Sequence, residues 1–150
     1  MFQGGAMQQG KRIHQLHLGD SVQMIKQISD EDVRLFAKLS GDENPIHLDE
    51  EYASHTIFKH RVAHGHFVAS MFSTLLGTQL PGEGSIYLGQ QIKYVAPVYI
   101  NDQITAQAKI IEKNEERNRV KIETTAFNQN GQLVVTGIAE IMPPKEVNNA

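Results

Sequence analysis

The chain has 150 residues, of which 40% are hydrophobic and 21% charged, and it contains no cysteine. This composition favours one globular domain with a substantial core, and it excludes disulfides, thiolate nucleophiles and zinc sites built on sulfur. The formal net charge of -3 gives no general nucleic-acid footprint, and no apolar segment is long enough to span a bilayer. We therefore expect a cytoplasmic protein that binds neither nucleic acid nor membrane.

The two ends of the chain are expected to lie outside the domain. Residues 1–6 lack the charged start and apolar stretch of a signal peptide, so we interpret them as an expression-derived extension or a disordered segment, with the natural start at Met7. Residues 143–150 have the composition of a polar tail. The prediction is therefore a single domain over residues 7–142.

The first expected elements are a strand over residues 21–28 and a helix that follows it. The hydroxyl of Ser29 can cap the first turn of this helix, and three acidic residues after it complement the positive end of the helix dipole. Asp49 is expected to cap a short turn through Ala53. Residues 54–62 are expected to form an irregular connection.

The segment after the first helix places Asp42 and His47 five positions apart around a turn stiffened by Pro45. A carboxylate and an imidazole so placed could hold one water, remove its proton and return a proton to substrate. The same Gly-Asp-x-Asn-Pro pattern is also a good turn sequence, in which Asp42 or Asn44 caps backbone amides. Both interpretations remain open from the spacing alone.

A second helix is predicted over residues 65–78. Its residues are apolar or small on every face, so we expect it to be buried nearly all round. Four runs with strand periodicity follow, over residues 86–95, 104–110, 120–126 and 133–142. A charged connection at residues 114–118 and an Asn-Gly turn at residues 130–131 predict antiparallel hairpins.

One buried helix and four or five antiparallel strands predict a mixed α+β fold, in which a curved sheet wraps around the long helix. This is the hotdog architecture. A single sheet of this kind leaves strand edges uncovered, so we expect a homodimer, which could associate further.

The residues around the turn, Leu39-Ser40-Gly41-Asp42-Glu43-Asn44-Pro45-Ile46-His47, closely resemble the MaoC-like (R)-specific enoyl-CoA hydratases of the short, single-domain kind. The similarity extends through His64-Gly65, through residues 75–90 and through Pro97-Val98-Tyr99, and so covers roughly residues 20–142.

The resemblance implies a reversible syn hydration of trans-2-enoyl-coenzyme A to the (R)-3-hydroxyacyl thioester. It implies that Asp42 and His47 hold the catalytic water and that the amide of Gly65 binds the thioester carbonyl. Ser73 matches a position near the acyl pocket, and Asn44 belongs to the same substrate-binding set. Neither a metal nor a redox cofactor is implied, because coenzyme A is part of the substrate.

Two features qualify this resemblance. His66 stands where a flexible hydrophobe such as Met is expected, and it could narrow the acyl tunnel or simply point outward. The four histidines His55, His60, His64 and His66 lack a recognised metal-ligand spacing, so no metal site is expected.

Two rival functions remain open at this point. The first is a 3-hydroxyacyl-[acyl-carrier-protein] dehydratase, which would use the same chemistry with another carrier. The second is a non-catalytic acyl-thioester-binding subunit, because a fold can lose its activity. The joint presence of Asp42, Asn44, His47 and Gly65 argues against the second rival.

Overall fold

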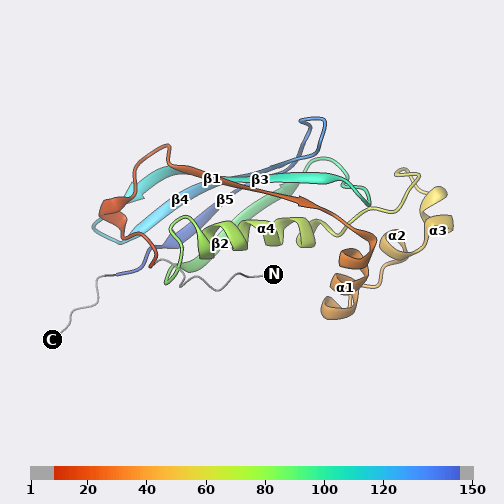
Figure 1. Cartoon of the computed structure of the whole chain (residues 1–150), viewed down its shortest axis with the longest axis horizontal. Coiled ribbons are helices and arrows are strands. Elements are labelled where there is room, and N and C mark those ends of the chain that lie inside the picture. Colours follow the sequence, from red (N-terminus) through yellow and green to blue (C-terminus); the bar gives the residue numbers. More distant parts are fainter. Residues whose placement is uncertain (1–8, 146–150) are drawn as a thin grey trace.

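The computed structural model describes residues 9–145 and shows an antiparallel five-stranded sheet with one long helix, α4 (Gly65–Thr78), across one face (Figure 1). This is the α+β hotdog arrangement that the sequence predicts. The predicted extension at residues 1–6 lies outside the described residues, as do residues 146–150 of the predicted tail. Within residues 9–145, no helix has the length and apolar character needed to cross a membrane.

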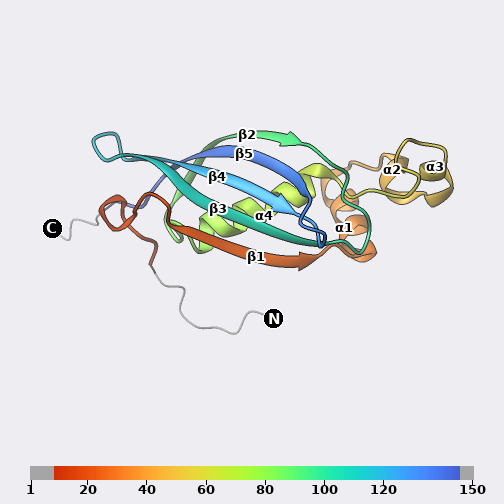
Figure 2. The ribbon, with the colours of Figure 1, turned by 90° about the horizontal axis from the view of Figure 1, so that it is seen from above.

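The sheet has the strand order β1-β3-β4-β5-β2, and every neighbouring pair is antiparallel (Figure 2). Its strands are β1 (Ser21–Gln27), β2 (Ile86–Tyr94), β3 (Gln103–Asn114), β4 (Arg119–Phe127) and β5 (Leu133–Met142). Strands β3, β4 and β5 form the two hairpins that were predicted from their turns. Strand β2 pairs with β5 rather than with β3, so β1 and β2 form the two edges of the sheet.

The core lies between the sheet and α4. Alternate residues of β3 and β4 are at most 1% exposed, as the strand periodicity predicts. These residues are Ile104, Ala106, Ala108, Ile110, Val120, Ile122, Thr124 and Ala126. The apolar residues among them form one cluster with the buried face of α4, where Val68, Phe72 and Leu75 are fully buried.

The prediction that α4 is buried nearly all round is wrong for the single chain. The sheet covers only one side of the helix, because five strands that curve over a helix leave its opposite side open. His66, Ser70, Ser73 and Thr74 are exposed on this uncovered side. These residues are polar, so the exposed side does not present a large apolar surface.

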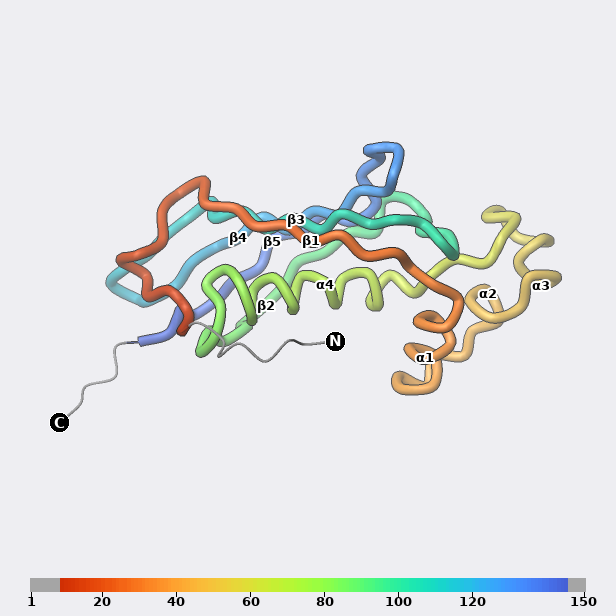
Figure 3. The backbone as a smooth tube through the Cα atoms, viewed as in Figure 1, coloured from red at the N-terminus to blue at the C-terminus, as the bar shows by residue number. Residues whose placement is uncertain are grey.

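Three short helices gather beyond one end of the sheet (Figure 3): α1 (Asp30–Ser40), α2 (Pro45–Leu48) and α3 (Glu50–Ser54). The predicted Ser29 cap is confirmed, because its hydroxyl accepts a hydrogen bond from the amide of Asp32 at 3.0 Å. Gly41 ends α1 with a φ of 81°, a left-handed conformation that suits glycine. The chain then turns toward the N-terminal end of α4.

Candidate active site

The segment between α1 and α2 is held by its own side chains. The amide of Asp42 donates to the Ser40 hydroxyl at 3.1 Å, and the amide of Asn44 donates to a carboxylate oxygen of Asp42 at 3.2 Å. Asn44 in turn caps α2, with its side-chain oxygen accepting from the amide of Ile46 at 3.3 Å. The turn interpretation of the sequence is therefore correct as local structure. It fixes the backbone that carries Asp42.

The helix α2 was not predicted, and it sets the direction of His47. Pro45 occupies its first turn, where a missing backbone N–H costs nothing, so the chain continues as a helix instead of a loop. His47 lies in the last turn of α2 and is buried. Its side chain is thereby directed inward, whereas the Asp42 side chain is 53% exposed.

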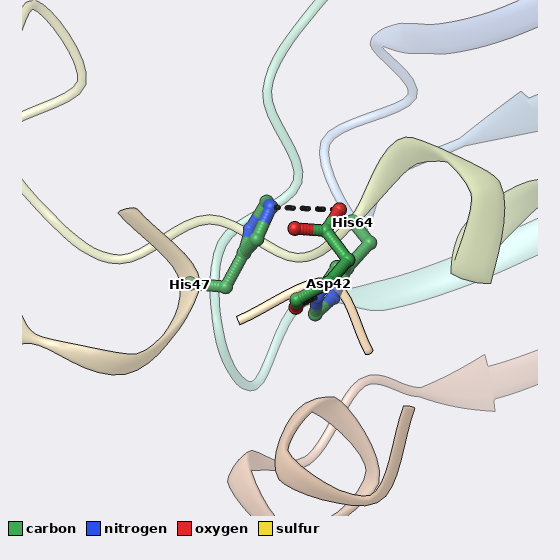
Figure 4. A group of neighbouring side chains, drawn as sticks. All are labelled: Asp42, His47 and His64. Carbon is green, nitrogen blue, oxygen red and sulfur yellow. Dashed lines mark hydrogen bonds and ion pairs between the residues drawn. The ribbon is translucent and has the colours of Figure 1, made fainter. Parts of the chain in front are cut away.

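The hydrogen bonds of His47 define which ring nitrogen carries the proton. Nδ1 lies 2.7 Å from the backbone carbonyl of Val62. A carbonyl oxygen can only accept, so Nδ1 must donate. In the neutral ring, Nε2 is then the nitrogen with the free lone pair, and this atom faces Asp42 (Figure 4).

The gap between Asp42 and His47 is the central chemical feature of the site. Nε2 of His47 and Oδ2 of Asp42 are 3.9 Å apart, which is too long for a direct hydrogen bond. Both atoms are acceptors when His47 is neutral and Asp42 ionised. A water that donates one hydrogen to each group can span this separation, with its oxygen lone pairs free for attack.

His64 joins these two residues to form a compact polar cluster (Figure 4). Asp42, His47 and His64 each offer an atom of metal-ligand type, and these atoms lie within 4.8 Å of one another. The Nε2 atom of His64 is 2.9 Å from the backbone carbonyl of Asp42, so this nitrogen is used within the protein. The four histidines considered in the sequence do not gather: His60 contacts Glu50 at 2.8 Å, and His66 contacts Tyr94.

A cavity of about 340 Å³ opens beside the start of α4. Its walls are mostly apolar and include Gly65, Val68, Tyr94, Pro97 and Val135. The helix begins at Gly65 with no side-chain cap, and the amides of Phe67 and Val68 donate to the His64 carbonyl, so the Gly65 amide lies ahead of the first hydrogen-bonded turn. A positive partial charge also develops there. The cavity therefore has a mostly apolar lining and lies next to the N-terminus of α4 at Gly65.

Arg61 anchors the backbone of His47 through a hydrogen bond. Its Nε donates to the His47 carbonyl at 2.7 Å, and its Nη2 donates to a carboxylate oxygen of Asp30 at 2.6 Å. The hydrogen bond from Arg61 is the largest influence on Asp30 and lowers the pKa of that carboxyl, with a smaller contribution from Arg34. Arg61 is 9% exposed and joins α1 to α2.

We expect Arg61→Met to lower the free energy of unfolding by about 2 kcal/mol, because two hydrogen bonds made by a buried charged group are lost. A lowered pKa of Asp30 in the folded state stabilises the protein above pH about 4, and this contribution disappears as the pH falls further. Thermal unfolding at pH 7 and at successively lower pH measures both effects. The variant should lose less stability than the parent across the acid range.

Arg34→Met is the matched control. Arg34 also contacts Asp30, at 3.0 Å, but its side chain is 53% exposed. An exposed pair of this kind contributes about 0–1 kcal/mol. Equal losses of stability in Arg34→Met and Arg61→Met would contradict the anchoring role of Arg61.

The structure brings together only part of the predicted site. Asp42 and His47 both contact His64, the residue directly before Gly65, but only Gly65 of the predicted residues lines the cavity. Asn44 lies exposed at the start of α2. Ser73 lies on the exposed side of α4 and does not line the cavity. His66 also lies outside, where its Nδ1 is 2.9 Å from the Tyr94 hydroxyl.

Sequence reasoning did not assign a part to His64, Arg61 or Tyr94. His64 entered the sequence analysis only as part of the His64-Gly65 match and as one of four histidines without metal-ligand spacing. The signal for His64 was its place directly before the glycine that opens α4. No local signal marks Tyr94, which reaches Gly65 from the edge strand β2.

A family model described as "MaoC like domain" matches residues 16–131. The chain belongs to the MaoC-like family. This match confirms the resemblance noted in the sequence, and it covers the segments that carry Asp42, His47 and Gly65.

Several named proteins can be aligned with this MaoC-like protein over most of its length. The "(R)-specific enoyl-CoA hydratase" of Aeromonas caviae is 41% identical over 129 residues, which cover 86% of this chain and 96% of that protein. The protein of the same name from Rhodospirillum rubrum is 44% identical over 126 residues, covering 84% and 87%. The solved structure of R-hydratase PhaJ1 from Pseudomonas aeruginosa has a TM-score of 0.86 at 41% identity, covering 94% and 92%.

Proposed function

We propose that this MaoC-like protein catalyses the reversible hydration of a trans-2-enoyl-coenzyme A to the (R)-3-hydroxyacyl-coenzyme A. The observation that carries the proposal is the pair of acceptor atoms on Asp42 and His47, 3.9 Å apart, next to the open start of α4. The relatives named (R)-specific enoyl-CoA hydratase support the same reaction.

In the proposed reaction, Asp42 and His47 orient one water by each accepting a hydrogen bond from one of its two O–H groups; only one of these protons is later transferred. The water oxygen attacks carbon 3 of the enoyl group while Nε2 of His47 takes a proton. The π electrons of the C2–C3 bond move toward the thioester carbonyl and produce an enolate. A proton from the same pair then reaches carbon 2 on the same face, so that one water is added in all.

Gly65 is the proposed binding partner of the thioester carbonyl. Its amide at the helix N-terminus would donate to the oxygen that gains negative charge as the enolate forms. His64, the residue immediately before Gly65, contacts the backbone of Asp42. Activation of the water and of the thioester would therefore converge on neighbouring atoms.

Asn44 and Ser73 are proposed as further substrate contacts. Asn44 is exposed at the rim of the site, beside Asp42. Ser73 lies eight residues beyond Gly65, or about 12 Å along the helix axis. An acyl chain that runs along α4 would reach it. We propose that the reaction needs neither a metal nor a redox cofactor, since water, an acid–base pair and a carbonyl-binding amide suffice.

Turnover of crotonyl-coenzyme A tests the proposed function. Loss of the conjugated thioester absorbance, together with oxidation of the product by an (R)-specific 3-hydroxyacyl dehydrogenase, is the expected result. The rate should be unchanged after dialysis against EDTA. Turnover only of the carrier-protein thioester would identify the dehydratase instead. Absence of turnover with either thioester, at any acyl length, would contradict the proposed hydration and favour the non-catalytic acyl-thioester-binding subunit.

We also propose that the protein is a cytoplasmic homodimer. Strand β2 is an edge of the sheet, and five large apolar residues on it or next to it are 38–53% exposed: Ile86, Tyr87, Leu88, Tyr94 and Val95. An unpaired edge with such side chains favours pairing with a second copy. A molar mass of one chain in solution, at the concentration used for the assay, would contradict the dimer.

A further inference from the structure

His64 occupies a position in the active site that the proposed reaction does not use directly. It is 2% exposed, and its Nε2 lies 2.9 Å from the backbone carbonyl of Asp42. Its ring stacks on the ring of His47, with centroids 3.7 Å apart and an interplanar angle of 26°. Phe36 of α1 packs against it at 4.7 Å. The imidazole thus touches both members of the water-binding pair (Figure 4).

The hydrogen bond to Asp42 fixes the tautomer of His64. A carbonyl only accepts, so Nε2 carries the hydrogen and Nδ1 keeps its lone pair. Nδ1 is buried and has no hydrogen-bond partner among residues 9–145. A buried polar atom without a partner is unfavourable for folding, and such atoms call for an explanation. The imidazole is therefore kept at this position at some cost to stability, which points to its other two contacts, the hydrogen bond to Asp42 and the stacking on His47.

The surroundings favour the uncharged form of His64. Burial lowers the pKa of its imidazole, and the nearby His47 lowers it further, whereas the backbone and carboxylate of Asp42 act in the opposite direction. The charged or titratable groups that face it are therefore Asp42 and His47, and the contact from α1 is the apolar Phe36. A neutral ring in this position does not oppose the protonation of His47 by charge repulsion, and the proposed reaction needs that protonation.

We propose that His64 is the positioning residue of the Asp42–His47 pair. Its N–H holds the Asp42 backbone, and its flat face holds the His47 ring, so that the two acceptor atoms remain at the separation that one water spans. The inference rests on the proposed hydration, because it assigns His64 a part in the same site. His64 itself makes no contact with the reacting atoms.

Three variants separate the two contacts of His64. His64→Gln keeps an N–H donor but removes the ring, His64→Phe keeps a flat ring but removes the donor, and His64→Ala removes both. We expect kcat for crotonyl-coenzyme A to fall about 100-fold in His64→Ala, because small displacements of catalytic groups have effects of this size. The other two variants should lie between this value and the parent. KM should stay within about twofold, since positioning acts on the transition state.

The double variant Asp42→Asn/His64→Ala gives a readout that general loss of stability would not produce. If His64 acts through the pair, its removal should change kcat little once Asp42 has been replaced, so the two effects should not multiply. Circular dichroism and thermal unfolding identify the variants that fold. If His64→Ala does not fold, the same comparison can be made with His64→Gln and His64→Phe, each of which keeps one of the two contacts.

The possible results separate this inference from the proposed function. An active parent with an inactive Asp42→Asn and an unimpaired His64→Ala would overturn only the positioning role. So would effects that multiply in the double variant, or a raised KM with unchanged kcat. An inactive parent on all thioesters would overturn the proposed function itself.

Discussion

Asp42→Asn is expected to lower kcat for the hydration of crotonyl-coenzyme A by about 10²–10⁴-fold, the range typical of general acid–base groups. The substituted side chain keeps an oxygen that can accept from the amide of Asn44, as Asp42 does at 3.2 Å, so the turn should persist. What is lost is the negative charge and one of the two acceptors for the water. The initial rate of absorbance loss measures the effect.

Asp49→Asn is the matched control for this experiment. Asp49 lies seven residues further along, and its carboxylate caps α3 by accepting from the amide of Tyr52 at 3.1 Å. Asparagine is an equally good N-cap, so both activity and thermal stability should be retained. Activity that survives in Asp42→Asn, or that is lost equally in Asp49→Asn, would refute the assignment of Asp42 as the catalytic carboxylate.

Gly65→Ala is expected to reduce kcat/KM by about 10²–10³-fold, the size of the loss when a donor no longer meets a developing oxyanion. Alanine keeps the backbone N–H, so the loss would come from displacement of the thioester by the added methyl group. A Cβ at this position would lie 2.6 Å from Cε1 of the Tyr94 ring, much closer than two carbon atoms approach in proteins. Tyr94 is 43% exposed, so its ring can move away. The movement would open the wall of the cavity at the point where the thioester carbonyl is proposed to bind.

Gly77→Ala is the control within the same helix. Apart from the adjacent helix backbone, no atom of residues 9–145 lies within 4 Å of the Cβ that alanine would add there. Alanine is favoured over glycine in a helix interior by about 1 kcal/mol, and the variant should be somewhat more stable and fully active. A fully active Gly65→Ala would refute the proposal that the cavity at Gly65 receives the thioester.

The elements of the fold could be predicted because their signals are local. The cap at Ser29, the alternation on β3 and β4 and the turn at Gly131 each act within a few residues, and the structure agrees with all three. The exposure of one side of α4 could not be predicted in this way. It depends on how much of the helix five strands can cover, and this is decided only when the sheet curves.

The same distinction between local and long-range signals applies to the candidate site. Asp42 and His47 are five positions apart, so their proximity follows from a single turn. The contact of His64 with the Asp42 carbonyl joins residues 22 positions apart, and that of Arg61 with Asp30 joins residues 31 positions apart. These long-range contacts form only when the short helices pack next to the N-terminus of α4. The sequence contains no local signal from which the partners of His64 and Arg61 could be predicted.

The β3–β4 turn lies at the opposite end of the sheet from α1, α2 and α3 (Figure 2). Glu116 is exposed in this turn, and the chain contains no cysteine. Glu116→Cys would therefore introduce a single thiol, separated from Asp42, His47 and Gly65 by the length of the sheet. A fluorophore or a surface linker could be attached there at one defined position in each chain, far from the candidate active site, which makes the protein well suited to immobilisation and single-molecule work.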